Sequence, residues 1–535
     1  MIRVRPGQAT QATFGLRVLA PRGKSLATDV YLPSTGSRPA PALVVRTPFG
    51  KFSHLDEASA WASLGYAVVV QDVRGRYDSD GQAEHADQGM EDLAHDSAAT
   101  LEWVTRQVWC DGRLIVAGQS AEAAFAWAGA LARPDAVGAI VSVAARTPIG
   151  DPLFSGAGPR GLPRLEDELW WRTTFATGRT VAGRGYQDAI ASQPRLLATL
   201  PVADLVRAGG PAVPGWERLC DGAQPPALAI EEAARLEVPV QHVTSWFDRD
   251  AELSIRAFGA NENGCRPQPR RALVSGPWAF ATTTRLAEGC TLDLGSRACT
   301  PPAAFTAAWL RSLAGGDGEA ACQGSAVDAY VVGADEWVTA GSWPPAATST
   351  VAMFAGPGGS LGVSPCMHTG ECAFVDDPSD PFPSGDHGGD HSSTLGRDGA
   401  ATFVSAPLAS PLRWCGSPVV VVAGRSDSPA DWFARLLRVR PTGQASLLGE
   451  AAGDEPNKGA EDQEGVVVRM AQSFVELAAG ERLALQVSGS CFPRWARNLH
   501  TGADRLHTAR WATARQWVRW GGDAPTRVEL PQVGQ

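Results

Sequence analysis

The stretch RLIVAGQSAEAAFAWAGALA, residues 113–132, joins an apolar run to an alanine-rich run through a short turn. Branched apolar side chains in the first run favour a buried strand. The second run, 121–132, consists mainly of strong helix formers. Ser120 stands at the junction. The stretch therefore predicts a strand, a sharp turn that carries a serine, and a helix.

The same alternation of strand and helix patterns continues on both sides of this stretch. Further apolar runs that predict strands lie at 41–47, 66–73, 139–145, 239–248 and 270–278. Apolar side chains at helical spacing predict helices at 91–107 and 301–315. This β-α-β order predicts a doubly wound α/β sheet.

The length of 535 residues is too great for one hydrophobic core, and the patterns divide the chain into four segments. Residues 1–145 form the first part of the α/β domain. Short helical stretches joined by Gly and Pro loops predict an inserted helical cap at 146–236. The α/β domain resumes at 237–322. Short alternating strands separated by turns predict a jelly-roll β-sandwich at 323–535.

Composition and charge exclude several classes of protein. The net charge of −10 argues against nucleic acid or an anionic membrane as the main partner. The first 15 residues lack the apolar core of a signal peptide, and no run of about 18 apolar residues predicts a membrane span. The ten cysteines form no CxxC pair, so we expect no zinc site. We expect a cytoplasmic protein that uses no cofactor and acts on a small molecule.

Ser120 has the sequence context of a nucleophile elbow, since it follows a buried strand and precedes a helix. The usual pattern is G-x-S-x-G, but here Glu122 replaces the last glycine and Ala123 follows it. A serine that caps the start of a helix explains this short stretch equally well.

Motifs along nearly the whole chain resemble a known family. They are VRTPFGKF (45–52), DVRGRYDSDG (72–81), SWFDRD (245–250), GPW (276–278), VVGADEWVTAGSWPP (331–345), DDPSDPFPSGDHGG (376–389) and RLALQVSGSCFPRWARNLHTG (482–502). In this order they resemble the family of cocaine esterase, X-prolyl dipeptidyl aminopeptidase and α-amino-acid ester hydrolases. The resemblance implies an α/β-hydrolase domain with an inserted helical cap and a C-terminal jelly-roll domain. It is compatible with a homodimer.

The resemblance implies a Ser–His–Asp triad, in which Ser120 matches the nucleophile and Asp248 matches the acid. The histidine that would follow GPW plus one residue is replaced by Phe280. The tyrosine that would stabilise the oxyanion is replaced by Phe49, although the amide of Ala121 remains as a donor. Both replacements remove groups that handle protons or negative charge.

Another group would have to replace the missing base. No histidine occurs between 243 and 367, which excludes a shift along the same loop. The candidates for a relocated base are His54, His85, His387 and His391. For the last two, in DHGGDH (386–391), a polar surface loop is the favoured alternative, and we expect no metal there. His242 is better explained as a buried strand histidine, and Glu122 as a charge at a helix N-terminus.

Several aromatic residues are candidates for lining a substrate pocket. Trp278 and the pair Trp170 and Trp171 lie in segments that frame the family's site, whereas core packing explains Trp246 and Phe247 equally well.

Three hypotheses for function follow. The first is an enzyme with a degenerate triad that has abandoned hydrolysis for cyclisation, elimination, isomerisation or acyl transfer on a small apolar acylated or peptide-like intermediate. A composition rich in alanine and arginine and poor in lysine associates it with bacterial biosynthesis of specialised metabolites. The second is a serine esterase or amidase in which a relocated base activates Ser120. The third is a non-catalytic binding protein.

Overall fold

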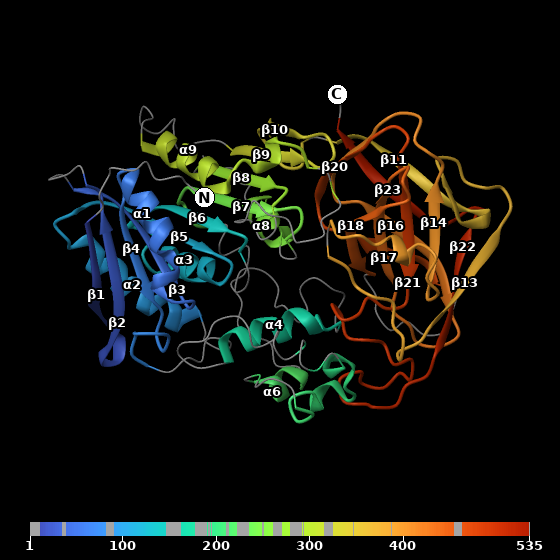
Figure 1. Cartoon of the computed structure of the whole chain (residues 1–535), viewed down its shortest axis with the longest axis horizontal. Helices are drawn as coiled ribbons and strands as arrows, with labels where there is room; N and C mark the ends of the chain where they lie inside the picture. Colours follow the sequence, from blue (N-terminus) through green and yellow to red (C-terminus); the bar gives the residue numbers. More distant parts are fainter. Residues whose placement is uncertain are drawn as a thin grey trace.

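The structure is a computed structural model. It describes residues 11–34, 39–81, 90–145, 162–176, 190, 193, 195–209, 213, 215–221, 235–248, 251–259, 270–278, 292, 294–314, 325–345, 347–386, 388–453 and 463–533. Figure 1 shows an α/β domain and an all-β domain side by side, with two helices of a third region lying between and below them.

A mixed sheet of ten strands forms the centre of the α/β domain, in the order β1-β2-β4-β3-β5-β6-β7-β8-β9-β10. The strands are β1 (Gln11–Ala20), β2 (Lys24–Leu32), β3 (Ala40–Thr47), β4 (Ala67–Asp72), β5 (Cys110–Gln119), β6 (Val137–Val143), β7 (Val240–Ser245), β8 (Arg271–Gly276), β9 (Ser325–Val331) and β10 (Glu336–Ala340). Strands β3 to β9 pair in parallel. The continuous apolar runs of β3 and β4 suit strands that are covered on both faces.

Helices cover both faces of this sheet. Helices α2 (Met90–Thr105), α3 (Ala121–Ala132) and α8 (Ala251–Gly259) share a core with one face. Helices α1 (Leu55–Ser63) and α9 (Pro302–Ala314) share a core with the other face. The predicted doubly wound arrangement is therefore confirmed. None of the helices in the described ranges is both long and apolar enough to cross a bilayer.

The cap region contains α4 (Leu165–Ala176) and α6 (Trp216–Cys220). Its buried side chains share one hydrophobic cluster with Ala496 and Leu506 of the C-terminal domain. Backbone hydrogen bonds reinforce this contact, including one of 2.9 Å from the Ala203 amide to the Leu506 carbonyl. The cap is thus attached to a long loop of the β domain.

In its described residues, the C-terminal domain contains strands and short 3-10 turns. Its strands are β11 (Ala347–Gly356), β12 (Ser360–Gly362), β13 (Gly370–Asp376), β14 (Ala400–Ser405), β15 (Leu412–Gly416), β16 (Val419–Ser426), β17 (Phe433–Val439), β18 (Ala445–Ala452), β19 (Gln463–Arg469), β20 (Ser473–Leu477), β21 (Arg482–Ser488), β22 (Ala514–Trp520) and β23 (Arg527–Val533). All of their pairings are antiparallel except that of β12 with β14. An α/β-hydrolase domain followed by an all-β domain is the predicted fold class.

The division of the sheets differs from the prediction at one point. Residues 323–535 were expected to form the β-sandwich, but β9 and β10 extend the first sheet beyond β8. An alternating strand pattern reports a half-buried strand and not which sheet it joins. The first sheet therefore extends to Ala340, and the second begins with β11.

Candidate active site

Ser120 lies in a strained turn between β5 and α3. Its backbone angles are φ 54° and ψ −117°, outside the regions that non-glycine residues ordinarily occupy. Its amide donates a 2.8 Å hydrogen bond to the Val143 carbonyl, and its carbonyl accepts one of 3.2 Å from the Ala123 amide. The Ser120 side chain makes no capping hydrogen bond. The geometry is that of a nucleophile elbow, and the helix-cap alternative does not hold.

Gly118 makes this tight turn possible. A Cβ atom at position 118 would stand 2.3 Å from the carbonyl carbon and oxygen of Glu122, both of which belong to the backbone. The first turn of α3 therefore packs directly on the end of β5. The close contact with α3 occurs at Gly118, the first glycine of the motif. The elbow therefore persists although Glu122 replaces the second glycine.

Asp248 lies at the same edge of the sheet as Ser120. It follows the end of β7, and only β6 separates β7 from β5. With strands about 4.8 Å apart, the ends of β5 and β7 stand roughly 10 Å from each other. Asp248 is buried, and its carbonyl accepts a hydrogen bond from Ala251 at the start of α8. Across such a distance, a triad needs a third side chain between serine and aspartate.

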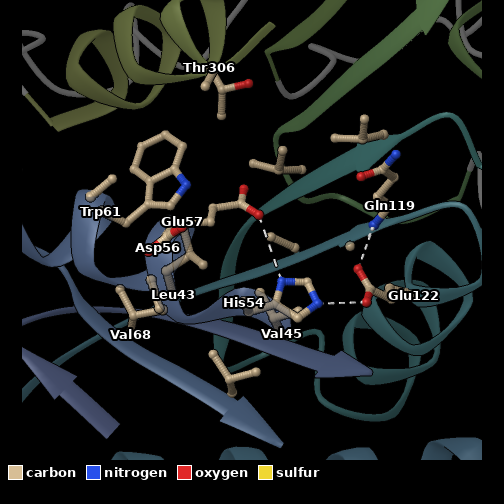
Figure 2. Close-up of a pocket in the computed structure, with 18 of the residues that line it drawn as sticks. Leu43, Val45, His54, Asp56, Glu57, Trp61, Val68, Gln119, Glu122 and Thr306 are labelled. Carbon is tan, nitrogen blue, oxygen red and sulfur yellow. Dashed lines mark hydrogen bonds and ion pairs between the residues drawn. The ribbon is translucent and has the colours of Figure 1, made fainter. Parts of the chain in front are cut away.

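Two of the predicted site residues meet beside the elbow. His54, which ends the 3-10 turn before α1, places Nε2 2.8 Å from Oε1 of Glu122. The second Glu122 oxygen accepts a hydrogen bond of 3.3 Å from the Gln119 amide. On the other side of the ring, His54 Nδ1 lies 3.6 Å from Oε2 of Glu57. Figure 2 shows the imidazole between the two carboxylates.

The two carboxylates determine the charge of this histidine. Burial alone would lower the pKa of His54, but the Glu122 carboxylate outweighs that effect, with help from Glu57, and raises the pKa to about 10. Interaction with His54 in turn lowers the pKa of Glu57 below its ordinary value. At neutral pH, His54 is therefore an imidazolium between carboxylates and has no lone pair to accept a proton from Ser120.

A cavity of about 720 Å³ opens at this ion pair, between the sheet and helices α1 and α9. We call it the α1/α9 cavity. Its described lining residues are Leu43, Val45, Ser53, His54, Asp56, Glu57, Ala58, Ser59, Ala60, Trp61, Val68, Val70, Ala117, Gly118, Gln119, Glu122, Val141, Val143, Pro301, Pro302, Ala303 and Thr306. Sheet residues supply an apolar floor, and the segment 53–59, which joins the 3-10 turn to α1, supplies most of the polar groups.

Of the other histidine candidates, the structure describes His391. His391 lies in the β domain, where its Nε2 is 3.1 Å from the Asp386 carbonyl oxygen and its amide bonds to Ala445. His85 and His387 lie outside the described residues. No described histidine forms a hydrogen bond with the Ser120 hydroxyl. In the described part of the chain, no three Asp, Glu, His or Cys side chains are placed to hold a metal ion.

His242 is the buried strand histidine that the sequence predicts. It lies on β7 between the rings of Trp127 and Phe258, and burial lowers its pKa to about 3. It is therefore neutral, and it belongs to the core beneath α3 and α8.

The aromatic candidates are placed mainly in cores. Trp278 is fully buried, packs with Phe305 and Trp337, and donates a 3.0 Å hydrogen bond to the Thr300 carbonyl. Trp246 is likewise buried and donates to the Tyr330 carbonyl. Trp170 is half-buried against the hydrophobic cluster of the cap. The side chain of Trp171 lies outside the described residues, and Phe247 is half-buried at the edge of the large core.

Phe49 and Ala121 keep the positions that the motifs predict. Phe49 is half-buried just after β3, and its amide donates a 3.1 Å hydrogen bond to Thr47 Oγ1. Ala121 is the buried first residue of α3, directly after the serine. Phe280 lies outside the described residues. Glu57 was not among the residues predicted from the sequence, where its only signal was its place three residues after His54.

The fold and the elbow define an α/β-hydrolase with a C-terminal β domain. The family description for X-Pro dipeptidyl-peptidase (S15 family) matches residues 22–281, and that for the X-Pro dipeptidyl-peptidase C-terminal non-catalytic domain matches residues 320–529. The chain therefore belongs to the X-Pro dipeptidyl-peptidase family of serine hydrolases, together with its cocaine esterase-like members.

Individual relatives agree with this assignment. The chain is 26% identical to a cocaine esterase from Rhodococcus sp. (strain MB1 Bresler), over 96% of each chain. An α-amino acid ester hydrolase of known structure is 20% identical with a TM-score of 0.78, over 99% of this chain and 98% of the other. An aminopeptidase from a marine sediment archaeon, Thaumarchaeota archaeon, is 19% identical with a TM-score of 0.77, over 98% and 96%. The two structures show a shared fold over nearly the whole chain.

Proposed function

We propose that this family member catalyses a non-hydrolytic reaction, namely a cyclisation, elimination, isomerisation or acyl transfer. The substrate is a small apolar acylated or peptide-like intermediate of a biosynthetic pathway. One observation carries the proposal. Ser120 is held in a strained elbow, yet Phe280 occupies the sequence position of the family's catalytic histidine. No described histidine forms a hydrogen bond with the Ser120 hydroxyl.

The retained strain supports a functional role for Ser120. A non-glycine residue at φ 54° costs about 1–3 kcal/mol, which persists only where the surroundings impose it. Asp248 also remains buried at the same sheet edge. A non-catalytic protein has no need of a strained serine and a buried aspartate, so these features favour an enzyme.

The replaced residues argue against hydrolysis. Loss of a triad member lowers the rate by about 10⁴-fold, and loss of one oxyanion donor by about 10²-fold. Phe280 and Phe49 together remove both functions. Reactions that depend mainly on holding one substrate in a shaped cavity tolerate these losses better, because proximity and orientation supply much of their acceleration.

His54 is unsuitable as the relocated base that the esterase alternative requires. Both ring nitrogens face carboxylates, and the pKa of about 10 keeps the ring protonated at neutral pH. A protonated imidazole is not a general base for Ser120.

Restoring the missing histidine tests the proposal. We expect the wild-type protein to hydrolyse p-nitrophenyl butyrate no faster than Ser120→Ala. Phe280→His should gain at least about 10²-fold in kcat/KM, because it restores the histidine that the family motif has at this position as the general base. Adding Phe49→Tyr should raise the rate further. The gain should vanish in the matched Phe280→His/Ser120→Ala variant.

A second assay identifies the reaction type. The wild-type protein and Ser120→Ala are each incubated with small-molecule extracts of the producing cells, and products are compared by mass spectrometry. A Ser120-dependent product that is an isomer of its precursor, or a set of products whose summed mass equals that of the reactants without water, supports the proposal. Products whose summed mass exceeds that of the precursor by one water, or wild-type ester hydrolysis equal to that of Phe280→His, contradict it.

A further inference from the structure

We propose that the α1/α9 cavity is a binding site for a protonated amine attached to an apolar body, with the Glu57 carboxylate as its counter-ion. The inference does not depend on the reaction at Ser120. Every described residue that lines the cavity belongs to the α/β domain, and none comes from the cap or the β domain.

The size and walls of the cavity suit a small organic molecule. Its volume of about 720 Å³ falls within the range of ligand pockets, which are typically 300–1,000 Å³. Side chains of Leu43, Val45, Val68, Val70 and Val141 form its floor. An apolar floor with a few polar groups at one end is the usual construction of such sites.

The charges at the polar end favour a cation. Three carboxylates, those of Asp56, Glu57 and Glu122, line the cavity together with one imidazolium, that of His54. No lysine or arginine is among its described lining residues. The polar end therefore carries an excess of negative charge beside apolar walls, which favours a ligand with a positive group.

Glu57 is the carboxylate best placed to meet the ligand. Its side chain is 64% accessible, whereas that of Glu122 is 5% accessible and engaged by His54 and Gln119. In Figure 2, the Glu57 carboxylate lies between the Trp61 ring and the His54 ring. His54 orients Glu57 and lowers its pKa, so the counter-ion is ionised before the ligand arrives. Trp61 also lines the cavity, and its side chain interacts with the Glu57 carboxylate.

Three probes of similar size and different charge test the site by isothermal titration calorimetry. They are 2-phenylethylamine, the neutral 2-phenylethanol and the anionic 3-phenylpropanoate. We expect the amine to bind at least about tenfold more tightly than the alcohol, and the acid to bind more weakly than both. Quenching of tryptophan fluorescence that is present in the wild-type protein and lost in Trp61→Phe provides a second readout.

Matched variants locate the binding. Glu57→Gln keeps the shape of the side chain. It should weaken binding of the amine by about tenfold or more and leave the affinity for the alcohol unchanged. Glu57→Asp keeps the charge and should retain part of the preference. Glu102→Gln, an exposed carboxylate of α2 paired with Arg106, should have no effect. Thermal unfolding of each variant confirms that it is folded.

The outcomes separate this inference from the proposed function. Ser120→Ala should bind the amine like the wild type, whatever the esterase assays show. Equal affinity for the three probes, an unchanged amine affinity in Glu57→Gln, or absence of amine binding at millimolar concentration would overturn the inference.

Discussion

On strand β3, the neighbouring residues Val44 and Val45 point to opposite faces of the first sheet and meet different surroundings. Val44 belongs to the closed core beneath α2 and α3, together with Trp127. Val45 faces α1 and α9, where it lines a cavity of about 720 Å³. One face is filled with apolar side chains, and the other keeps space and most of the charged groups near the elbow. The comparison suggests that the filled face imposes the geometry of Ser120, while the open face provides room for chemistry or binding.

The elbow connects the two faces. Helix α3 packs on the filled face, but its second residue, Glu122, directs its carboxylate to His54 on the open face. The absence of the second motif glycine is thus linked to an ion pair, because a side chain at this position reaches across the end of β5.

The largest effect of a substitution on stability is expected at the elbow, where the two faces of the sheet join. Gly118→Ala places a Cβ atom 2.3 Å from backbone atoms of Glu122, so the start of α3 must move. We expect a loss of roughly 2–4 kcal/mol in the free energy of unfolding, measured with urea. Gly138→Ala on β6 is the matched control, since its nearest neighbour is the Leu114 carbonyl oxygen at 3.5 Å. Equal losses in the two variants would show that the elbow is not closely packed.

The ion pair on the open face should make stability depend on pH. The pKa of His54 is raised from 6.5 to about 10 in the folded state, so its contribution is complete below pH 6.5 and is lost as the pH rises towards 10. Glu122→Gln should therefore destabilise the protein by roughly 2 kcal/mol more at pH 6 than at pH 10. Urea unfolding of both proteins across this range measures the difference. A constant difference would mean that His54 is not held as an imidazolium.

The valine pair compares the faces directly. Val44→Ala should lower the free energy of unfolding by about 2 kcal/mol, because a filled core cannot close around the space left by the lost methyl groups. Val45→Ala should cost about half as much, since part of its surface already faces the cavity. The two variants are compared by urea unfolding at neutral pH. Equal costs would indicate that the cavity is filled in solution.

The smallest effect concerns the strain at Ser120. Ser120→Gly should be more stable than Ser120→Ala by about 1 kcal/mol, because glycine accepts φ 54° without steric cost. Thermal unfolding of the two variants suffices. If alanine were the more stable, the elbow would be relaxed and the argument for a retained functional serine would fail.

Much of the fold could be predicted from the sequence because its signals are local. The helix predicted at 121–132 is α3 with the same bounds, and the valine-rich runs became β3 and β4. The assignment of β9 and β10 to the first sheet could not be predicted, because an alternating pattern of apolar and polar residues does not indicate which strand will be the pairing partner. The elbow at Ser120 was one of two open alternatives until its backbone angles distinguished them.

Several individual residues of the site could be predicted from the sequence, but the contacts between them could not. His54 and Glu122 were separate candidates, 68 residues apart, and only the fold brings them within 2.8 Å. Glu57 gave no distinctive signal in the sequence. Trp278, expected at a pocket, lies in an aromatic core, because a buried tryptophan and a pocket tryptophan look alike in a sequence.

Reaction with a fluorophosphonate tests the central claim most directly, since this reagent attaches only to a serine that a base activates. Intact mass is recorded for the wild-type protein, for Phe280→His, and for Ser120→Ala as the unreactive control. The account predicts no adduct on the wild-type protein under conditions that label Phe280→His completely at Ser120. An adduct on wild-type Ser120, formed as fast as in Phe280→His, would show that another base activates the serine and would contradict the account.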